Sequence, residues 1–392
     1  MKKILFVYHV SKIGGGSYCL LNLLKAVDRT VFKPVVMLPR IGPLSEEIKK
    51  LNIEIIYYPP LTLYPYNQSV WSIKTIRKLF NMVKCFKGFT KVIKQEKPDI
   101  VYLNTMMLFP FARLAKEEGC MTVLHVREHW PLNEHVRQLS WARNIADKYV
   151  DKLIAINRYS ASIFPQKEAT IIYDWINMDE RRGPTLKEVL CEDDSNINAY
   201  LFTGGIDPIK GTMEVISTFT KYVKGDDKRL LAFGIDKSVV FSGIKGNIKR
   251  VLSLLGFKSY KERVIALCNK DQRVICVPAI YNITDIMDKA CAFLSYFKMP
   301  HANLALAESI IMGIPSIAAQ TDESLEYSGE GDLASLFEFG NLALFEQCVK
   351  DFESGNYKLT ENHSDGVAML AEKFSKERNA AIFDKALKSL IS

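Results

Sequence analysis

Short apolar segments alternate with amphipathic helical segments along this chain of 392 residues, and this alternation restricts the fold more than any other feature. In the first half, the segments with the apolar content of buried strands are 4–9, 34–38, 54–57, 100–103, 121–126, 152–156 and 169–173. In the second half, they are 199–203, 230–233, 274–277, 292–295 and 316–319. Strands that alternate with helices form parallel sheets covered by helices on both faces, so the pattern predicts doubly wound α/β domains.

The alternation lapses between Asp174 and Asn198, where the chain is polar, and we place the interdomain linker there. The expected domains are an N-terminal one over 1–178 and a C-terminal one over 179–370. Residues 365–390 read as a terminal helical segment. The last part of the chain, 371–392, is expected to form a C-terminal helix that packs toward the N-terminal domain. Two such domains in tandem are expected to face each other across a cleft at the C-terminal ends of their strands, where ligands bind in this kind of fold.

Composition excludes several classes of protein. A hydrophobic content of 48% with 24% charged residues describes a soluble globular chain rather than a disordered or fibrous one. The eight cysteines are scattered without a C-x-x-C pair, and the acidic pairs at 193–194 and 226–227 fall in apparent loops, so we expect neither a disulfide framework nor a metal site. No run approaches the roughly 20 apolar residues of a membrane span, which favours a cytoplasmic location, peripheral to the inner face of the membrane at most.

Positive charge is concentrated in one segment, residues 71–97. It holds eight basic residues and one acidic residue, a net charge of +7 against +8 for the whole chain. Apolar residues recur between the cations at helical spacing, and Gly88 is a place where the helix could break. Two interpretations stay open, a basic helix that lies on an anionic membrane surface and an ordinary helix packed on the sheet with a solvated lysine face. No nucleic-acid-binding motif accompanies the patch, so nucleic acid is not expected as a partner.

The first strand runs into a glycine-rich turn, Gly14-Gly15-Gly16-Ser17, ahead of a helix over 18–26. Glycines allow backbone N–H groups to approach a phosphate, and a helix N-terminus favours an anion. The spacing is not that of a dinucleotide-binding loop, so a simple tight turn is an equal alternative. The strand over 121–126 carries His125 near its end, followed by Arg127 and Glu128, where an imidazole can hydrogen-bond a substrate hydroxyl or serve a structural role.

The second half repeats this arrangement. The segment Gly204-Gly205-Ile-Asp-Pro-Ile-Lys210-Gly211 joins a strand to a helix, and Lys210 is placed to neutralise a diphosphate. A later helix is expected over 303–313, with Gly313 as its C-cap and Glu308 in about its first turn. An isolated glutamate there is usually a capping or salt-bridged residue, but this position also faces the ligand edge of the sheet.

These four features, taken in order along nearly the whole chain, resemble the retaining GT-B-fold glycosyltransferases of the family 4 type, many of which build bacterial capsule, exopolysaccharide or lipopolysaccharide. The resemblance implies two Rossmann-like domains and metal-independent transfer of a sugar from a UDP- or GDP-linked donor, without a further cofactor. The acceptor it implies is a saccharide or lipid-linked saccharide. The residues that it places at the donor are Gly15, Gly16, Gly204, Lys210, His301, Asn303, Leu304 and Glu308. It places His125 beside the donor sugar, so that His125, Lys210 and Glu308 are the candidate catalytic residues. The acceptor-side candidates are Ser17, Arg127 and Glu128.

The chain departs from the family pattern at two positions. Gly205 stands where the family usually has an arginine that binds the diphosphate, and Pro300 stands where the first glutamate of the E-x₇-E motif is expected. Two other functions therefore stay open. One is a nucleotide-sugar epimerase of the same fold, and the other is a degenerate transferase that serves as a scaffold in a glycan-assembly complex.

Overall fold

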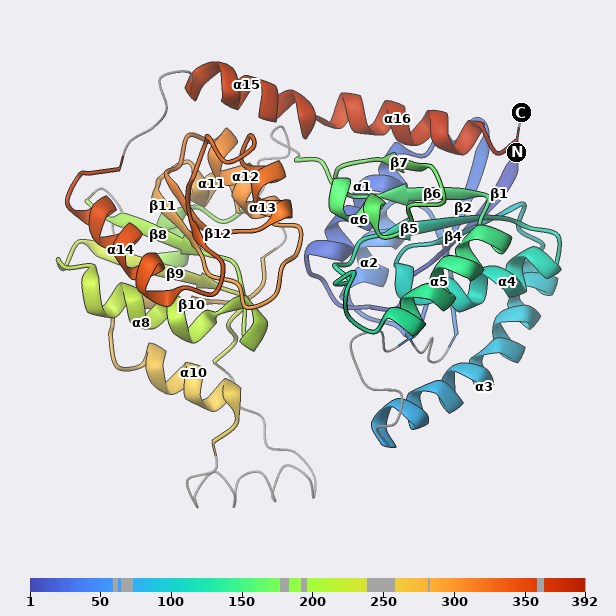
Figure 1. Cartoon of the computed structure of the whole chain (residues 1–392), viewed down its shortest axis with the longest axis horizontal. Helices are drawn as coiled ribbons and strands as arrows, with labels where there is room; N and C mark the ends of the chain where they lie inside the picture. The colour runs from blue at the N-terminus through green and yellow to red at the C-terminus, as the bar shows by residue number, and fades with distance from the viewer. Residues whose placement is uncertain are drawn as a thin grey trace. The chain divides into compact units, whose positions relative to one another are not determined.

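The computed structural model describes residues 1–58, 63–64, 73–176, 183–191, 196–237, 258–280, 283–357 and 363–391. Contacts divide the chain into two compact units, the first made of 1–175 with 373–392 and the second of 176–372. Each unit is built on one parallel sheet with helices packed against it (Figure 1). The predicted linker lies only partly within the described residues, where it includes the short helix α7 (Leu186–Leu190).

The first unit holds a seven-stranded parallel sheet with the order β3-β2-β1-β4-β5-β6-β7. Its strands are β1 (Lys2–Val7), β2 (Phe32–Leu38), β3 (Glu54–Tyr57), β4 (Ile100–Leu103), β5 (Met121–Val126), β6 (Lys152–Ala155) and β7 (Ala169–Ile171). Every residue of β4, at the centre, is buried, as expected for a parallel strand covered on both faces. All seven strand predictions for this half are confirmed, with ends that shift by at most two residues.

Helices cover both faces of this sheet. One face packs against α3 (Ile73–Glu96), α4 (Phe109–Glu117) and α5 (Val136–Tyr149) through a continuous apolar core. On the other face α1 (Gly15–Ala26) packs against α16 (Lys376–Lys388), the last helix of the chain (Figure 1). The shorter helices of the unit are α2 (Pro43–Lys50) and α6 (Arg158–Ser162).

The last helix is fixed to the first unit by specific contacts. The Asn379 side-chain oxygen accepts a hydrogen bond from the Tyr173 N–H at 3.0 Å, and the Phe383 ring lies edge-on to the Tyr102 ring at 6.0 Å between centroids. The single terminal helix expected over 365–390 is wrong in one respect. It is two helices, α15 (His363–Lys373) and α16, because the Ser375 side chain caps the second by accepting from the Arg378 N–H.

The second unit holds a six-stranded parallel sheet with the order β10-β9-β8-β11-β12-β13. Its strands are β8 (Asn198–Phe202), β9 (Lys228–Phe233), β10 (Val274–Val277), β11 (Ala290–Ser295), β12 (Ser316–Gln320) and β13 (Ser335–Glu338). The strands β8 to β12 confirm the five strands predicted for this half of the chain. The strand β13 was not predicted, since this four-residue edge strand has only one buried residue and so lacks the apolar run of the others.

One face of the second sheet packs against α8 (Thr212–Tyr222), α10 (Tyr260–Cys268) and α14 (Leu342–Glu353). The strands β11 and β12 also contact α12 (Leu304–Ile311), which packs against α13 (Asp322–Tyr327). A further short helix is α11 (Thr284–Met287). Of the helical insertion predicted over 247–269, only the part that forms α10 lies within the described residues.

The order of the strands reverses once in each sheet, between β1 and β4 in the first and between β8 and β11 in the second. At such a switch point the loops from the two strands run to opposite faces, which leaves a crevice at their carboxyl ends where ligands bind. The fold therefore provides two candidate ligand sites, one in each unit, and both contain residues predicted from the sequence.

Two structural findings concern membranes and metals. Among the described helices, none combines the length and the apolar content needed to cross a bilayer. Across the same described ranges, no group of three His, Cys, Asp or Glu side chains gathers as metal ligands do.

Candidate functional site

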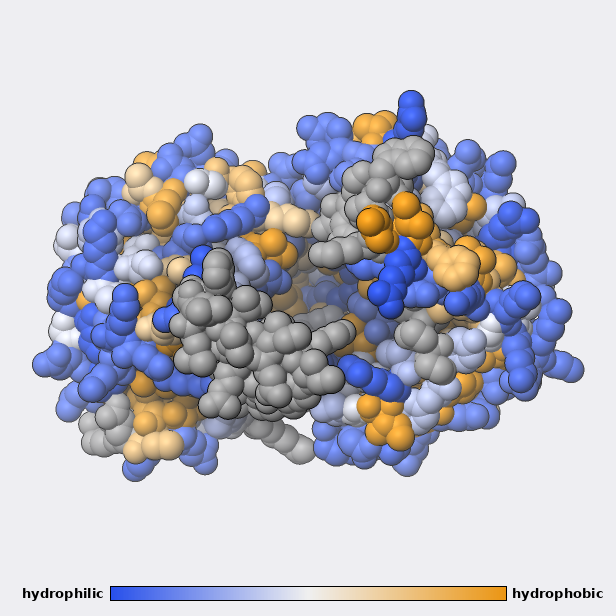
Figure 2. Space-filling view, turned by 90° about the horizontal axis from the view of Figure 1, so that it is seen from below, coloured by the Kyte–Doolittle hydropathy of each residue, from blue (hydrophilic) through white to orange (hydrophobic). Residues whose placement is uncertain are grey.

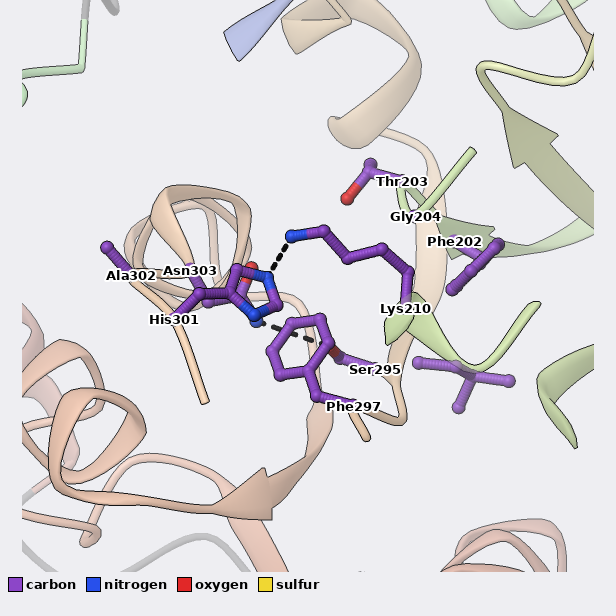
Figure 3. A pocket seen from close by; sticks show the side chains of 10 residues that line it. Phe202, Thr203, Gly204, Lys210, Ser295, Phe297, His301, Ala302 and Asn303 are labelled. Atoms are coloured by element: carbon purple, nitrogen blue, oxygen red, sulfur yellow. Dashed lines mark hydrogen bonds between the residues drawn. The ribbon is translucent and has the colours of Figure 1, made fainter. Parts of the chain in front are cut away.

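A pocket opens in the second unit at the carboxyl ends of β8 and β11, where the strand order reverses. Its lining, drawn in Figure 3, consists of Phe202, Thr203, Gly204, Lys210, Leu294, Ser295, Phe297, His301, Ala302 and Asn303. The cavity volume is about 50 Å³, small beside the roughly 300–1,000 Å³ of a pocket that encloses a whole ligand. The pocket can therefore receive one group of a larger ligand.

The segment Asp207-Pro-Ile-Lys-Gly211 builds the pocket wall that carries Lys210. The Asp207 carboxylate accepts from the Ile209 N–H at 3.0 Å and caps a single 3₁₀ turn, Pro208–Lys210. Gly211 then adopts a positive φ of 66°, and a Cβ there would lie 2.1 Å from the Tyr296 carbonyl oxygen, so only glycine fits. The helix α8 begins at the next residue, which places Lys210 beside its positive end.

Lys210 carries the positive charge of the pocket. Its Nζ lies 5.1 Å from the centroid of the Phe297 ring and donates a hydrogen bond to His301 Nε2 (Figure 3). Burial lowers the pKa of Lys210 to about 8, against the opposing effect of Asp207. Most Lys210 side chains are therefore protonated, and so positively charged, at neutral pH. Desolvation of this ammonium strengthens its attraction for an anion.

The hydrogen bonds determine the tautomer of His301. Its Nδ1 lies 3.0 Å from the Met299 carbonyl oxygen, which can only accept, so Nδ1 carries the proton. An ammonium can only donate, so Nε2 is the acceptor for Lys210. A neutral imidazole thus holds the ammonium in position without cancelling its charge.

The helix α12 follows directly from the pocket. Asn303 precedes it and donates from Nδ2 to Ser295 Oγ at 3.2 Å, which joins the start of the helix to the end of β11. Leu304 is the first residue of the helix and Glu308 the fifth, so Glu308 lies at the start of the second turn, just beyond the first turn in which it was predicted. Glu308 is partly buried, and burial raises the pKa of its carboxyl group to about 7. Neither Leu304 nor Glu308 lines the pocket itself.

The raised pKa of Glu308 has a consequence for stability. Between its ordinary pKa of 4.5 and about 7 the folded state binds more protons than the unfolded state, so stability falls as pH rises through this window. We expect Glu308→Gln to raise the free energy of unfolding of the ligand-free second unit by about 1–3 kcal/mol at pH 8. Hydrogen exchange of second-unit peptides at pH 5 and pH 8 measures it, with the exposed Glu372→Gln as control. An equal effect at both values would contradict the assignment.

A second cluster of polar side chains lies in the first unit, at the carboxyl ends of β1, β4 and β5. Val7, Leu103 and Leu124 are matched in register across these strands, so the next residues, Tyr8, Asn104 and His125, lie abreast. This row stands at the switch point of the first sheet, beside the N-terminus of α1. A Cβ on Gly16 would lie 2.8 Å from the Tyr8 hydroxyl oxygen, so the glycine turn allows close packing against that row.

Two largely buried acids, Asp174 and Glu128, organise this cluster. Arg127 Nη2 pairs with Asp174 Oδ2 at 2.6 Å, with only 10% and 12% of the two side chains exposed. The Glu128 carboxylate accepts from the Thr105 hydroxyl, from the Met106 N–H at 3.0 Å and from the Arg127 N–H at 3.1 Å. Burial nevertheless raises the pKa of Glu128.

Several polar atoms in the cluster are buried without a partner among the described residues. They are both side-chain atoms of Asn104, Nε2 of His125 and Nη1 of Arg127. His125 Nδ1 bonds the Tyr102 hydroxyl at 2.8 Å, and burial together with the charge of Arg127 holds its pKa well below the ordinary value, so the ring is neutral. Unsatisfied buried groups are rare in folded proteins, and a hydrogen-bonding ligand or ordered water is the usual explanation.

The predicted residues thus fall into two groups, one in each unit. In the second unit, Gly204, Lys210, His301 and Asn303 line one pocket, with Leu304 and Glu308 on the adjoining helix. In the first, Gly15 and Gly16 form the first turn of α1, so the helix begins three residues before the predicted Tyr18. Ser17 is buried and donates to the Lys12 carbonyl at 2.7 Å.

Sequence reasoning missed Tyr8, Asn104 and Asp174 in the first unit and Thr203 and Ser295 in the second. Asn104 and Thr203 directly follow a buried strand, and Ser295 ends one, on either side of a reversal in strand order. The signal was therefore present in the sequence, but only the strand order shows which strand ends are adjacent.

Comparison with known proteins agrees with this architecture. No family model and no curated protein matches the chain. Among solved structures, Alr3699/HepE of Anabaena in complex with UDP and glucose aligns with a TM-score of 0.70 at 18% identity, over 99% of this chain and 100% of that one. The lipopolysaccharide outer core galactosyltransferase WaaB aligns with a TM-score of 0.58 at 15% identity, over 99% of both chains. The chain has the GT-B fold.

The fold is shared by more than one activity. A putative UDP-N-acetylglucosamine 2-epimerase from Listeria monocytogenes aligns with a TM-score of 0.58 at 12% identity, over 97% of this chain and 94% of that one. At such identities the likeness establishes the GT-B fold alone, and the activity has to be argued from the site.

The local backbone of this chain accounts for the departure at Gly205. This residue has a positive φ of 66°, its N–H donates to the Phe233 carbonyl at 3.0 Å, and its carbonyl accepts from the Thr212 hydroxyl at 2.7 Å. The turn is closed by backbone bonds in a conformation that favours glycine. Gly205 is thus fitted to its own turn, and an arginine at this position would adopt a strained backbone.

Proposed function

We propose that this GT-B protein is a retaining, metal-independent glycosyltransferase of the family 4 type, which moves a sugar from a UDP- or GDP-linked donor to a saccharide acceptor. The observation that carries the proposal is the partly buried Lys210, held by His301 in a pocket at the switch point of the second sheet. An ammonium beside a helix N-terminus is suited to the phosphates of a donor. A lipid-linked acceptor and a place in bacterial cell-surface polysaccharide synthesis follow from the sequence resemblance.

The proposed chemistry needs charge stabilisation and no protein nucleophile. The bond between the anomeric carbon and the donor phosphate oxygen breaks, and the acceptor oxygen bonds to that carbon on the same face. The acceptor proton passes to the leaving phosphate. Lys210 stabilises the negative charge that develops on the diphosphate, an electrostatic contribution that is strongest in a desolvated pocket.

The other candidates take supporting roles in this proposal. Glu308 accepts hydrogen bonds from the ribose, and His125 bonds the donor sugar through its unpartnered Nε2. Gly15 and Gly16 present N–H groups of the first turn of α1 to phosphate. Ser17, Arg127 and Glu128 serve the acceptor side, where the free Nη1 of Arg127 is a ready donor to a hydroxyl.

The lining of the pocket favours transfer over the alternatives. Epimerisation requires acid and base groups that move protons on the sugar, whereas the described pocket carries one lysine and one histidine and no carboxylate. A scaffold that had lost catalysis would have no need to keep a partly desolvated lysine ammonium in a pocket, because desolvating a charge costs free energy.

A screen of nucleotide sugars tests the proposal. The intact protein is incubated in EDTA with UDP- and GDP-linked sugars, with and without saccharide acceptors, and release of nucleoside diphosphate is measured. We expect release from one class of donor, faster with acceptor, and stabilisation of the fold by that donor. Release that requires a divalent metal would contradict metal independence. Conversion of the donor sugar into its epimer without an acceptor would replace the proposal with the epimerase.

A further inference from the structure

The helix α3 has two apolar faces, and only one of them is used by the fold. The inner face packs on the core of the first unit through Met82, Phe89, Val92 and Ile93. Gly88 does not break the helix, contrary to one expectation. A Cβ there would overlap the Tyr58 hydroxyl, so glycine lets Tyr58 pack against the helix while the helix continues to Glu96.

The outer face begins with an apolar stripe formed by Ile73, Ile76, Phe80 and Val83. These side chains are exposed to 86%, 52%, 61% and 57%. At about 100° per residue, all four project within roughly 80° of one another, so they form one continuous ridge along three turns. Isolated exposed apolar residues are ordinary, but four in line on one helix indicate a surface that is covered in use.

The same outer face continues as a basic row formed by Lys84, Lys87, Lys91 and Lys94, all exposed. Arg77 lies beside the stripe, and Lys84 Nζ sits 4.5 Å from the centroid of the Phe80 ring, so charge reaches into the apolar part. Lys94 pairs with Glu118 at 3.3 Å. In the described part of the chain, no acidic side chain lies within ion-pair distance of Arg77, Lys87 or Lys91. Their charges are therefore available to a partner.

We propose that this outer face of α3 docks the first unit on an anionic lipid bilayer, with the apolar stripe inserted between headgroups and the basic row on the lipid phosphates. A bilayer with acidic lipids offers both components at once, an apolar interior for the stripe and a negative surface for the lysines. A second copy of this chain fits poorly, because it would bring two basic rows together. Figure 2 views the molecule from the side on which α3 lies in Figure 1, and hydrophobic and hydrophilic side chains are interspersed there over the first unit.

Sedimentation with vesicles tests this docking without any need for sugar transfer, so its result is independent of the proposed activity. The full chain is mixed with vesicles of phosphatidylcholine alone, or of phosphatidylcholine with phosphatidylglycerol. We expect binding to the second kind only, weakened by added salt because screening acts on exposed charges. The triple change Lys84→Glu, Lys87→Glu and Lys91→Glu is expected to lower this binding by about 100-fold or more.

Two control sets make the test specific. Lys148, Lys187 and Lys270 are exposed lysines on other helices or loops, and changing these three to glutamate alters net charge equally. That control is expected to weaken binding by less than about tenfold, because charges away from the bilayer are screened. The change Ile76→Ser with Phe80→Ser is expected to weaken binding about tenfold, whereas Leu344→Asn with Met369→Ser, also at exposed positions, is expected to leave it unchanged.

Three outcomes would overturn the proposal. The first is no binding to anionic vesicles, and the second is binding that the α3 changes leave intact. The third is binding to double-stranded RNA with the same affinity as to anionic vesicles, and with no change in that affinity when Ile76 and Phe80 are replaced. That result would identify a general polyanion-binding surface instead.

Discussion

Replacing Lys210 by methionine is expected to lower sugar transfer by about 100- to 1,000-fold, the usual effect of losing one preorganised group that stabilises transition-state charge. Methionine fills a similar volume but has no positive charge. The loss should appear mainly in kcat, because the charge on the leaving diphosphate grows as the bond breaks. The rate of nucleoside diphosphate release at saturating donor measures it.

A matched control lies on the helix that follows Lys210. Lys221 near the end of α8 is exposed and pairs with Glu346 at 3.6 Å, so Lys221→Met removes one lysine charge from the same unit without touching the pocket. We expect this variant to keep its activity. If Lys210→Met retained wild-type turnover with an intact fold, the assignment of Lys210 to the diphosphate would be wrong.

The pH dependence of Lys210 provides a second readout. With a pKa near 8, the free protein loses this charge as pH rises through 8, so affinity for a nucleoside diphosphate should fall above that value. Between pH 8 and the ordinary pKa of 10.5, the unfolded state binds more protons than the folded one, so stability rises with pH. Lys210→Met should flatten both profiles, as measured by calorimetric titration and by hydrogen exchange.

Replacing Asp174 by asparagine is expected to destabilise the first unit by about 3–5 kcal/mol, the cost of leaving one member of a buried ion pair uncompensated. Arg127 already has an unpartnered Nη1, and the substitution would deprive Nη2 of its anion as well. All four tryptophans of the chain lie between residues 71 and 175, so urea unfolding followed by tryptophan fluorescence reports on this unit selectively.

Two further variants serve as controls for the Asp174→Asn measurement. Lys33 and Glu54 form an ion pair in the same unit at 3.3 Å with about half of each side chain exposed, and Glu54→Gln should cost less than about 1 kcal/mol. The double change Arg127→Met with Asp174→Asn should be less destabilising than Asp174→Asn alone, because no buried charge is left unpaired. A double variant less stable than Asp174→Asn would show that packing of the arginine, rather than its charge, dominates.

Most strands of the fold could be predicted from the sequence because parallel strands buried on both faces are continuous apolar runs. Of the thirteen strands in the described residues, twelve were located in this way, whereas β13 was not, because an edge strand with one buried residue has no such run. The two terminal helices were read as one, since the stop at Ser375 depends on a side-chain cap rather than on a change in hydrophobic period.

For the site, local sequence determined the turn Asp207–Gly211 and hence the position of Lys210, because a capping aspartate, a proline and an obligatory glycine act over neighbouring residues. Only the tertiary structure brought His301 to Lys210 across 91 positions of sequence and Asp174 to Arg127 across 47. The order of the strands in the sheets determines these partners, because it brings together strand ends that are far apart in the chain. The protonation states in the pocket follow from the same assembly, since burial, which shifts each pKa, exists only once the sheets and helices have packed.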